Sequence, residues 1–188
     1  MLWPSLFAAA LNVAAAGDIT MPVSHSVAPV AEPSTPEVGG PAPDFDYQSY
    51  DYRWMQFHNM LQRDAIVMVF SPDDATLSGL EVQRETLAAH GLAPVAVFTH
   101  RDDDVWRIAT QLKLSYSLLA DPHGTIAEGF GLGNGSGELA PTAWFVIGGD
   151  GKIRACGRGT LRANALAAAA LEAMGVTPQA AEPPSAAN

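Results

Sequence analysis

The sequence predicts an α/β domain in which helices cover a mixed β-sheet. Two continuous apolar runs, residues 65–70 and 94–99, have the composition of strands that are buried on both faces. Each run is followed by a segment with apolar residues at helical spacing, and strands that alternate with helices indicate a parallel sheet. A later apolar run, 143–147, precedes a tight turn and a return strand, which adds an antiparallel portion.

The first half of the domain shows local reasons for each predicted element. Residues 44–57 contain two short, partly aromatic runs, which predict a hairpin ahead of the main sheet. Residues 77–90 place leucines at near-helical spacing and predict a helix with one apolar face. The next helix should begin at the three aspartates 102–104, because the helix macrodipole favours negative charge at its N-terminus.

The second half repeats the pattern with an antiparallel end. Residues 148–152, Gly-Gly-Asp-Gly-Lys, predict a hairpin turn, and residues 153–157 predict the returning strand. Residues 161–174 are rich in alanine and leucine and predict a helix. Trp106 and Trp144 fit positions in the core of such a fold.

Both ends of the chain differ in composition from this domain, which we expect at 38–176. Residues 1–17 are apolar, rich in alanine and end in small residues, which predicts a signal peptide or hydrophobic anchor despite the lack of a basic start. Residues 18–37 read as a proline-rich linker, and 177–188 as a disordered, low-complexity tail. The chain is therefore expected to be exported to the periplasm or another extracytoplasmic space, or anchored in a membrane.

Composition excludes some classes of function. Charged residues make up 16% of the chain and the net charge is −10, with no basic run. Such a chain does not bind nucleic acid or an anionic membrane surface through charge. Cys156 is the only cysteine, so neither an internal disulfide nor a Cys-x-x-Cys redox pair can form.

Four segments, in order, resemble the peroxiredoxins, the alkyl hydroperoxide reductase / thiol-specific antioxidant family. They are Val38-Gly39-Gly40-Pro41-Ala42-Pro43-Asp44-Phe45, the Pro72-to-Gly79 segment, Leu118-Leu119-Ala120-Asp121-Pro122-His123-Gly124 with Phe130-Gly131, and Pro141-to-Ile147 followed by Asp150-Gly151-Lys152-Ile153. The resemblance implies a thioredoxin-like fold with an N-terminal hairpin extension, and a redox, antioxidant role.

The candidate site departs from the family at its nucleophile. The family signature Pro-x-x-x-Thr-x-x-Cys matches at Pro72 and Thr76, but Gly79 occupies the position of the peroxidatic cysteine. A peroxide is cleaved by a thiolate, which a helix N-terminus helps to form, and glycine cannot act as one. Alternatively, Pro72 and Thr76 form only a strand-to-helix turn with a threonine cap.

A second departure lies in the late strand. Active peroxiredoxins carry an arginine just before this strand, and the corresponding position here is Thr142. Pro141-Thr142 instead resembles the cis-Pro-Thr of thioredoxins, which lies beside the redox site. The resemblance therefore implies a degenerate site in which cysteine and arginine are both absent.

Few other residues suggest chemistry. Cys156 lies between Arg154 and Arg158, which would make it a reactive thiol if both cations faced it; the alternative is an inert strand residue. The histidine and aspartate groups near 100–104 and 121–123 lack the spacing of a metal site, and the glycines at 131–137 match no phosphate loop. No cofactor and no metal are expected.

Two classes of function follow from these residues. In the first, the chain is a non-catalytic accessory or binding subunit with protein partners, in an assembly that can be membrane-associated. In the second, it is an antioxidant thiol oxidoreductase or peroxidase that uses Cys156 or a thiol of a partner.

Overall fold

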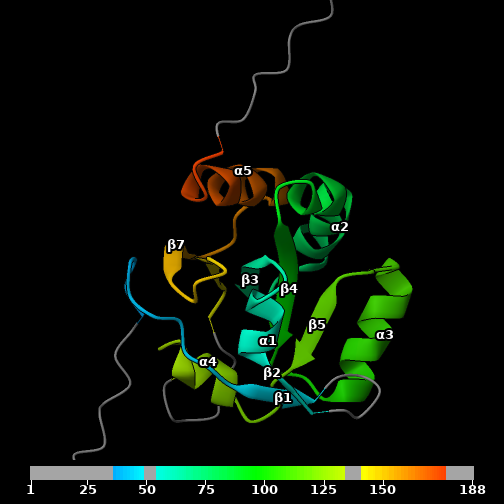
Figure 1. The fold of residues 1–188 in the computed structure, drawn as a ribbon. Helices are drawn as coiled ribbons and strands as arrows, with labels where there is room; N and C mark the ends of the chain where they lie inside the picture. The colour runs from blue at the N-terminus through cyan, green and yellow to red at the C-terminus, as the bar shows by residue number, and fades with distance from the viewer. Residues whose placement is uncertain (1–35, 49–53, 134–140, 177–188) are drawn as a thin grey trace, which may run out of the picture. The chain divides into compact units, whose positions relative to one another are not determined.

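A computed structural model describes residues 36–48, 54–133 and 141–176 (Figure 1). The main sheet has five strands in the order β5-β4-β3-β6-β7. Its strands are β3 (Ala65–Phe70), β4 (Leu92–Phe98), β5 (Ser117–Ala120), β6 (Ala143–Ile147) and β7 (Ile153–Arg158).

The sheet is mixed, as the sequence predicts. β3, β4 and β5 run parallel to one another, whereas β6 is antiparallel to β3 and β7 is antiparallel to β6. All six residues of β3, the central strand, are buried, because the strand has helices above and below it. The turn between β6 and β7 lies at 148–152, as expected.

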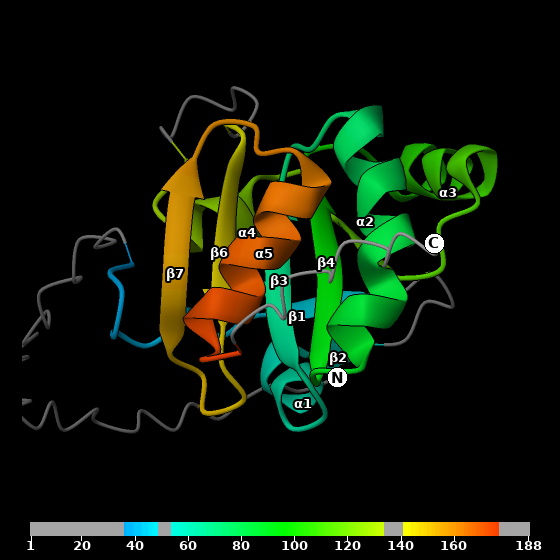
Figure 2. The same cartoon turned by 90° about the horizontal axis from the view of Figure 1, so that it is seen from above.

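Helices cover both faces of the sheet, and Figure 2 shows α2 and α5 side by side on one of them. This face carries the three longest helices, which are α2 (Asp74–Ala88), α3 (Asp102–Leu112) and α5 (Ala163–Ala173). The other face carries two short helices and a hairpin, which are α1 (Phe57–Leu61), α4 (Thr125–Gly129), β1 (Asp46–Gln48) and β2 (Trp54–Gln56).

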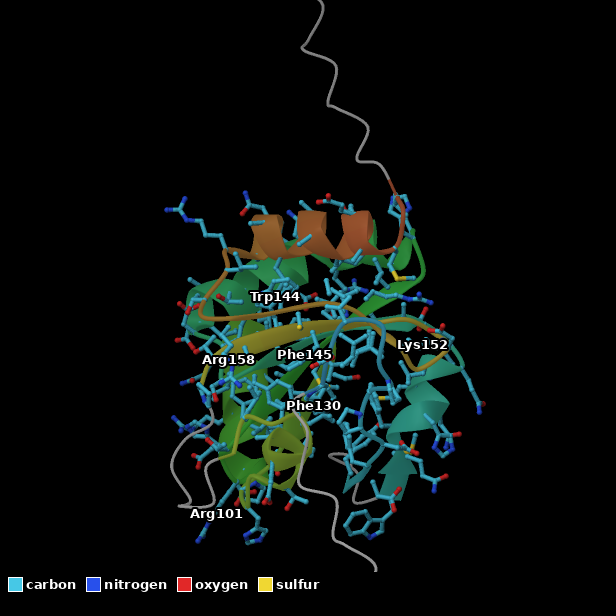
Figure 3. All side chains as sticks on the ribbon, turned by 90° about the vertical axis from the view of Figure 1, so that its left-hand side faces the viewer. Arg101, Phe130, Trp144, Phe145, Lys152 and Arg158 are labelled. Atoms are coloured by element: carbon cyan, nitrogen blue, oxygen red, sulfur yellow. The ribbon has the colours of Figure 1, made fainter. Side chains whose placement is uncertain are left out.

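Alternating side chains of the strands divide the core between these faces. Val69 and Val146 pack with leucines of α2 and α5, whereas Met68 and Phe145 pack on the side of α1 and α4. In Figure 3, Trp144 lies toward α5, while Phe145 and Phe130 lie on the opposite side. The rings of Phe130 and Phe145 meet edge to face at 4.8 Å.

The residues that precede the hairpin attach to the edge of the sheet at β7. Gly39 donates its N–H to the Ile153 carbonyl at 2.8 Å, and Ile153 donates back to Gly40 at 2.9 Å. Ala42 donates to the Gly151 carbonyl at 2.8 Å. The N-terminal hairpin extension that the resemblance implies is therefore present and tied to the late hairpin.

The structure differs from the expectations in three ways. It adds α1, β5 and α4, which are each five residues or shorter and carry no periodic pattern. It begins α2 at Asp74 rather than at 77, because Asp73 caps the helix. The placement of Trp106 in the core is wrong: the indole is 62% exposed, because the buried side of α3 is formed by Val105 and its helical neighbours.

No helix in the described part of the chain is long and apolar enough to cross a membrane. The predicted signal peptide or anchor (1–17), the linker (18–37, apart from its last two residues) and the tail (177–188) lie outside the described residues. Their predictions therefore stay predictions.

Candidate functional site

The candidate site lies where β3 ends and α2 begins, at the carboxyl ends of two parallel strands. Ser71 donates its N–H to the Val97 carbonyl of β4 at 3.0 Å, so the loop is pinned to the sheet. Ser71 has a φ of 47°, in the left-handed region that residues other than glycine rarely adopt. Pro72, next in the chain, is buried. The surrounding structure therefore holds this turn in one conformation.

Asp73, not Thr76, caps helix α2. The Asp73 Oδ1 atom accepts the Thr76 N–H at 2.7 Å. Hydrogen bonding from the Thr76 side chain, and then from this N–H, lowers the pKa of the Asp73 carboxyl. The expected threonine cap is therefore wrong, although the loop still brings Thr76 into a buried position. The helix N-terminus, which would stabilise a thiolate in a peroxidase, already interacts with a carboxylate of the chain itself.

Gly79 is packed against the first residue of α5. A Cβ atom built on Gly79 would lie 2.5 Å from the Cβ of Ala163, which is closer than real Cβ contacts come. Gly79 also lies five residues inside α2, beyond the four N–H groups that a helix leaves without an internal partner. The position thus lacks a nucleophile, room for a side chain, and an unpartnered backbone donor.

Thr142, the position that the resemblance aligns with the family arginine, lies against this loop. Its Oγ1 hydroxyl donates to the Ser71 carbonyl at 3.2 Å, and its own carbonyl accepts the Gly159 N–H at 2.7 Å. A threonine brings no charge to the loop and acts as a tether between β6 and the end of β3. The structure therefore brings Pro72, Thr76, Gly79 and Thr142 to one end of the sheet.

Cys156 belongs to a different region. It lies opposite Phe145 in the pairing of β7 with β6, and it packs, half-buried, on the cluster that faces α1 and α4. Gly79 lies in a helix on the other face of the sheet. The arginines beside Cys156 are engaged elsewhere: Arg154 pairs with Asp150 at 2.7 Å, and Arg158 donates to the Gly131 carbonyl at 3.2 Å.

The aspartate and histidine groups near 100–104 and 121–123 do not form a metal site among the described residues, and Asp121 has a structural role. Asp121 is 4% exposed and accepts the Ala127 N–H at 2.9 Å, so it supports the start of α4. Within the described ranges, no three side chains of His, Cys, Asp or Glu gather as a metal site would need. Most of the glycine-rich segment expected at 131–137 lies outside those ranges.

Two residues of the site were missed by sequence reasoning. Asp73 could have been found, because an aspartate directly before the first residue of a helix is a preferred N-cap. Ala163 could not, since it lies 84 positions after Gly79 and meets it only through the fold. Asp73 caps the helix that follows the loop, and Ala163 fills the space beside Gly79.

Comparison with known proteins places the whole domain. The AhpC/TSA family pattern matches residues 38–156. None of the curated proteins matches the chain. Among solved structures, it resembles the peroxidoxin BcpB from Mycobacterium tuberculosis with a TM-score of 0.68 and 21% identity, over 77% of this chain and 99% of that one.

Two further structures show the same fold at lower identity. AhpC from Enterococcus faecalis superimposes with a TM-score of 0.66 and 18% identity, over 75% of this chain and 94% of that one. The mitochondrial 2-Cys peroxiredoxin from Plasmodium falciparum gives a TM-score of 0.64 and 10% identity, over 74% and 95%. With a family match over most of the folded domain and a thioredoxin-like architecture, the chain belongs to the AhpC/TSA family of peroxiredoxin-like proteins.

Proposed function

We propose that this chain is a peroxiredoxin-like protein with a degenerate peroxidatic site, and that it acts as a non-catalytic accessory or binding subunit. One observation carries the proposal: the position of the nucleophile is Gly79, and the Cβ of Ala163 occupies the space that a side chain there would need. A missing thiol alone could reflect a displaced active site. The packing of α5 against this position supports a local structure that is adapted to glycine.

The rest of the loop supports this reading. Cleavage of a peroxide needs a thiolate that attacks one oxygen while donors stabilise the departing hydroxide. The one helix N–H that Asp73 binds is unavailable as a donor, and Thr142 provides a hydroxyl that is directed at the Ser71 carbonyl. Ser78 is no substitute for cysteine, because a hydroxyl needs an adjacent base to become a nucleophile.

The alternative function is a thiol oxidoreductase that uses Cys156 or a thiol of a partner. The only cysteine of the chain can form a disulfide only with another molecule. Its half-buried position and the engagement of both neighbouring arginines favour a structural role. The first proposal is therefore preferred, and the assay below separates the two.

The first experiment measures peroxide consumption by the full chain, with dithiothreitol as the reductant. We expect the background rate of dithiothreitol alone, both for the natural sequence and for Cys156→Ser. A rate far above background that Cys156→Ser abolishes would establish the alternative. A high rate that survives this substitution would mean that the degenerate-site proposal is wrong.

The second experiment rebuilds the site. Gly79→Cys is introduced together with Ala163→Gly, so that the new side chain has room, and is then combined with Thr142→Arg. Removing one preorganised donor costs an enzyme about 10²–10³ in rate. The variant with arginine should therefore react with peroxide faster than the variant without it by roughly that factor. Equal rates in stopped-flow oxidation would show that position 142 does not correspond to the family arginine.

We further propose that the chain is exported or membrane-anchored and works with protein partners, in an assembly that includes membrane-associated proteins. The support is the apolar, alanine-rich segment 2–16, followed by a proline-rich linker. Cell fractionation with N-terminal sequencing tests the location. Full-length protein found only in the soluble cytoplasm would contradict it, and proteins that co-purify from native membranes would identify the partners.

A further inference from the structure

A groove of about 600 Å³ lies between α3 and β5, away from the degenerate loop. Figure 1 shows α3 beside β5 at the edge of the sheet. Apolar and aromatic side chains form most of its wall, with Tyr47 of the N-terminal hairpin at one side. This volume and lining are typical of sites that bind a ligand or a peptide. No residue of the loop at 71–79 lines it.

Trp106 presents its indole at this groove. The side chain is 62% exposed, although Val105, the residue before it on the same helix, is buried against the sheet. Tryptophan, tyrosine and arginine dominate the binding energy of protein interfaces, because a large flat side chain covers much area at low entropic cost. An exposed tryptophan above an apolar groove is therefore an anchor for a partner.

The groove also contains the edge of β5 that faces away from β4. Among the described strands, only β4 pairs with β5. Asp121, just after β5, donates its N–H to the Phe98 carbonyl of β4. Backbone N–H and C=O groups point to opposite edges at successive residues of a strand, so every second residue before Asp121 also faces β4. Leu118 and Ala120 therefore direct their N–H and C=O groups toward the groove, where they offer hydrogen bonds to an added strand.

Lys113 gives the groove its charge. Among the described residues that line the groove it is the only charged one, in a chain with a net charge of −10. It ends α3 with a φ of 53°, at the position where helices favour glycine. A lysine is strained in this conformation, so the position is not optimised for stability. Because the other described residues of the lining carry no charge, the Lys113 ammonium favours a partner that carries a carboxylate.

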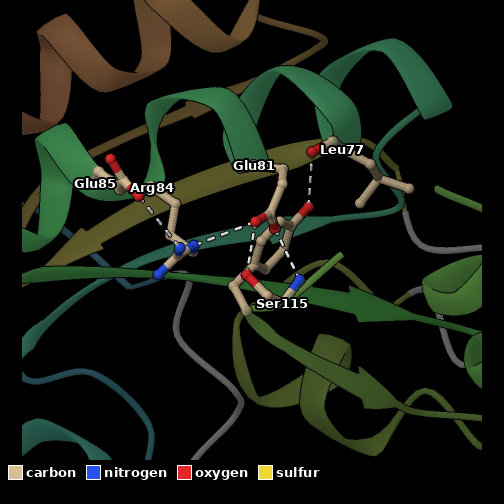
Figure 4. A network of polar contacts seen from close by, with 6 residues as sticks. Leu77, Glu81, Arg84, Glu85 and Ser115 are labelled. Atoms are coloured by element: carbon tan, nitrogen blue, oxygen red, sulfur yellow. Dashed lines mark hydrogen bonds and ion pairs between the residues drawn. The ribbon is translucent and has the colours of Figure 1, made fainter. Parts of the chain in front are cut away.

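Polar contacts hold the wall of the groove in place. Figure 4 shows Glu81 of α2 in contact with Ser115, whose N–H and hydroxyl donate to it at 2.8 and 2.6 Å. Tyr116 donates its hydroxyl to the Leu77 carbonyl at 3.1 Å. Because both ties come from α2, the segment that leads into β5 is rigid before a partner binds, which lowers the entropic cost of binding.

We propose that this groove binds an extended peptide segment of a partner protein, one that pairs with β5 and carries apolar side chains and a carboxylate. The carboxylate meets Lys113, an apolar side chain packs on Trp106, and the peptide backbone pairs with Leu118 and Ala120. The inference rests on the proposed binding role of the chain and names the surface and the chemistry of the partner.

The test uses two blocked heptapeptides of alternating valine and threonine, one with a central aspartate and one with a central lysine. Amide and indole NMR signals of the full chain are followed during titration. We expect the aspartate peptide to bind with a Kd below about 1 mM, a weak affinity. The signals of Leu118, Ala120 and the Trp106 indole should shift, and the lysine peptide should bind more weakly.

Matched variants separate the groove from the rest of the surface. Trp106→Ala should raise the Kd at least about tenfold, as for an interface anchor, whereas Trp54→Ala, which removes another exposed tryptophan, should leave it unchanged. Lys113→Gly should raise the Kd of the aspartate peptide about threefold and raise the Tm, because glycine relieves the strain. Lys152→Ala, at the only other lysine, should change neither.

Other outcomes overturn the proposal. They are no saturable binding of the aspartate peptide, a Kd that Trp106→Ala does not change, or shifts confined to other surfaces. Shifts that appear on raising the protein concentration alone would assign the groove to a second copy of the chain. Because the groove shares no residue with the loop, none of these results alters the outcome of the peroxide assay.

Discussion

Replacing Gly79 with alanine tests the packing on which the proposed function rests. In most helices this substitution stabilises by about 0.5–1 kcal/mol, because glycine loses more backbone freedom on folding. Here the new Cβ would lie 2.5 Å from the Cβ of Ala163. Carbon atoms in ordinary contact are about 3.5–4.0 Å apart, so α5 would have to retreat by at least about 1 Å.

The size of the effect follows from these two opposing terms. Overpacking a core typically costs about 1–3 kcal/mol, which exceeds the gain in helix propensity. We therefore expect Gly79→Ala to lower the free energy of unfolding by about 1 kcal/mol, and the Tm by about 2–4 °C for a chain of this size. Urea and thermal unfolding of the full chain, followed by circular dichroism, measure both quantities.

Two controls make this result specific. Gly129, the last residue of α4, would place a Cβ 3.5 Å from Pro43, an ordinary contact, so Gly129→Ala should be neutral or stabilising. Adding Ala163→Gly to Gly79→Ala moves the methyl group from one helix to the other. The double variant should be more stable than the sum of the single effects by about 1 kcal/mol, as coupled neighbours are.

The reasoning fails if Gly79→Ala is neutral or stabilising and Ala163→Gly does not rescue it. In that case α2 and α5 have space between them, and the position could hold a side chain. The absence of a cysteine would then be a simple substitution in an open site. The proposal of a site closed by packing would have to be withdrawn.

Three further predictions concern the contacts around the loop and the groove. Asp73→Ala should cost about 1 kcal/mol at neutral pH, as loss of a helix cap does. Because the folded pKa of Asp73 is lowered, its stabilisation is present above the unfolded pKa, near 4, and is lost as the pH falls through the folded value. The difference from the natural sequence should therefore shrink in acid unfolding below that pH. Thr142→Val should cost about 0.5–1.5 kcal/mol in urea unfolding, since it leaves the Ser71 carbonyl without its hydroxyl donor. Glu81→Gln should cost about 1–2 kcal/mol and speed hydrogen exchange at the Ser115 amide, because a charged acceptor is replaced by a neutral one.

The pH dependence of the Glu81 contact has a defined sign. Burial by itself raises the pKa of this carboxyl, but the hydrogen bonds from Ser115 and the nearby Arg84 outweigh it, and the net shift is downward. The stabilisation from Glu81 is therefore present above the pKa of the unfolded carboxyl and is lost as the pH falls through the lower folded value. Burial also raises the pKa of Tyr116, so its phenol stays neutral in the fold at high pH.

Much of the fold was predictable from the chain alone, because its strongest elements carry local signals. The central strand at 65–70 was predicted to the residue, since a strand buried on both faces is a continuous apolar run. The three aspartates at 102–104 marked the start of α3 through the helix dipole. That position 79 carries no thiol was also readable, because Gly79 stands at the spacing from Pro72 and Thr76 that the family signature gives to its cysteine.

Other features of the fold depend on contacts between residues far apart in the sequence. β5 has four residues, and a strand this short has no period of its own; it exists because it pairs with β4. Trp106 is apolar and lies on an amphipathic helix, yet it faces outward, because the sheet contacts the side of α3 that carries Val105.

The same reason applies to the candidate site. The chain alone shows that position 79 has no nucleophile, since that depends only on residue type. It could not determine that the position is also closed, because Ala163 reaches Gly79 only when α5 packs against α2. Residue chemistry is a local property, whereas the space around a residue is set by contacts between elements distant in the chain.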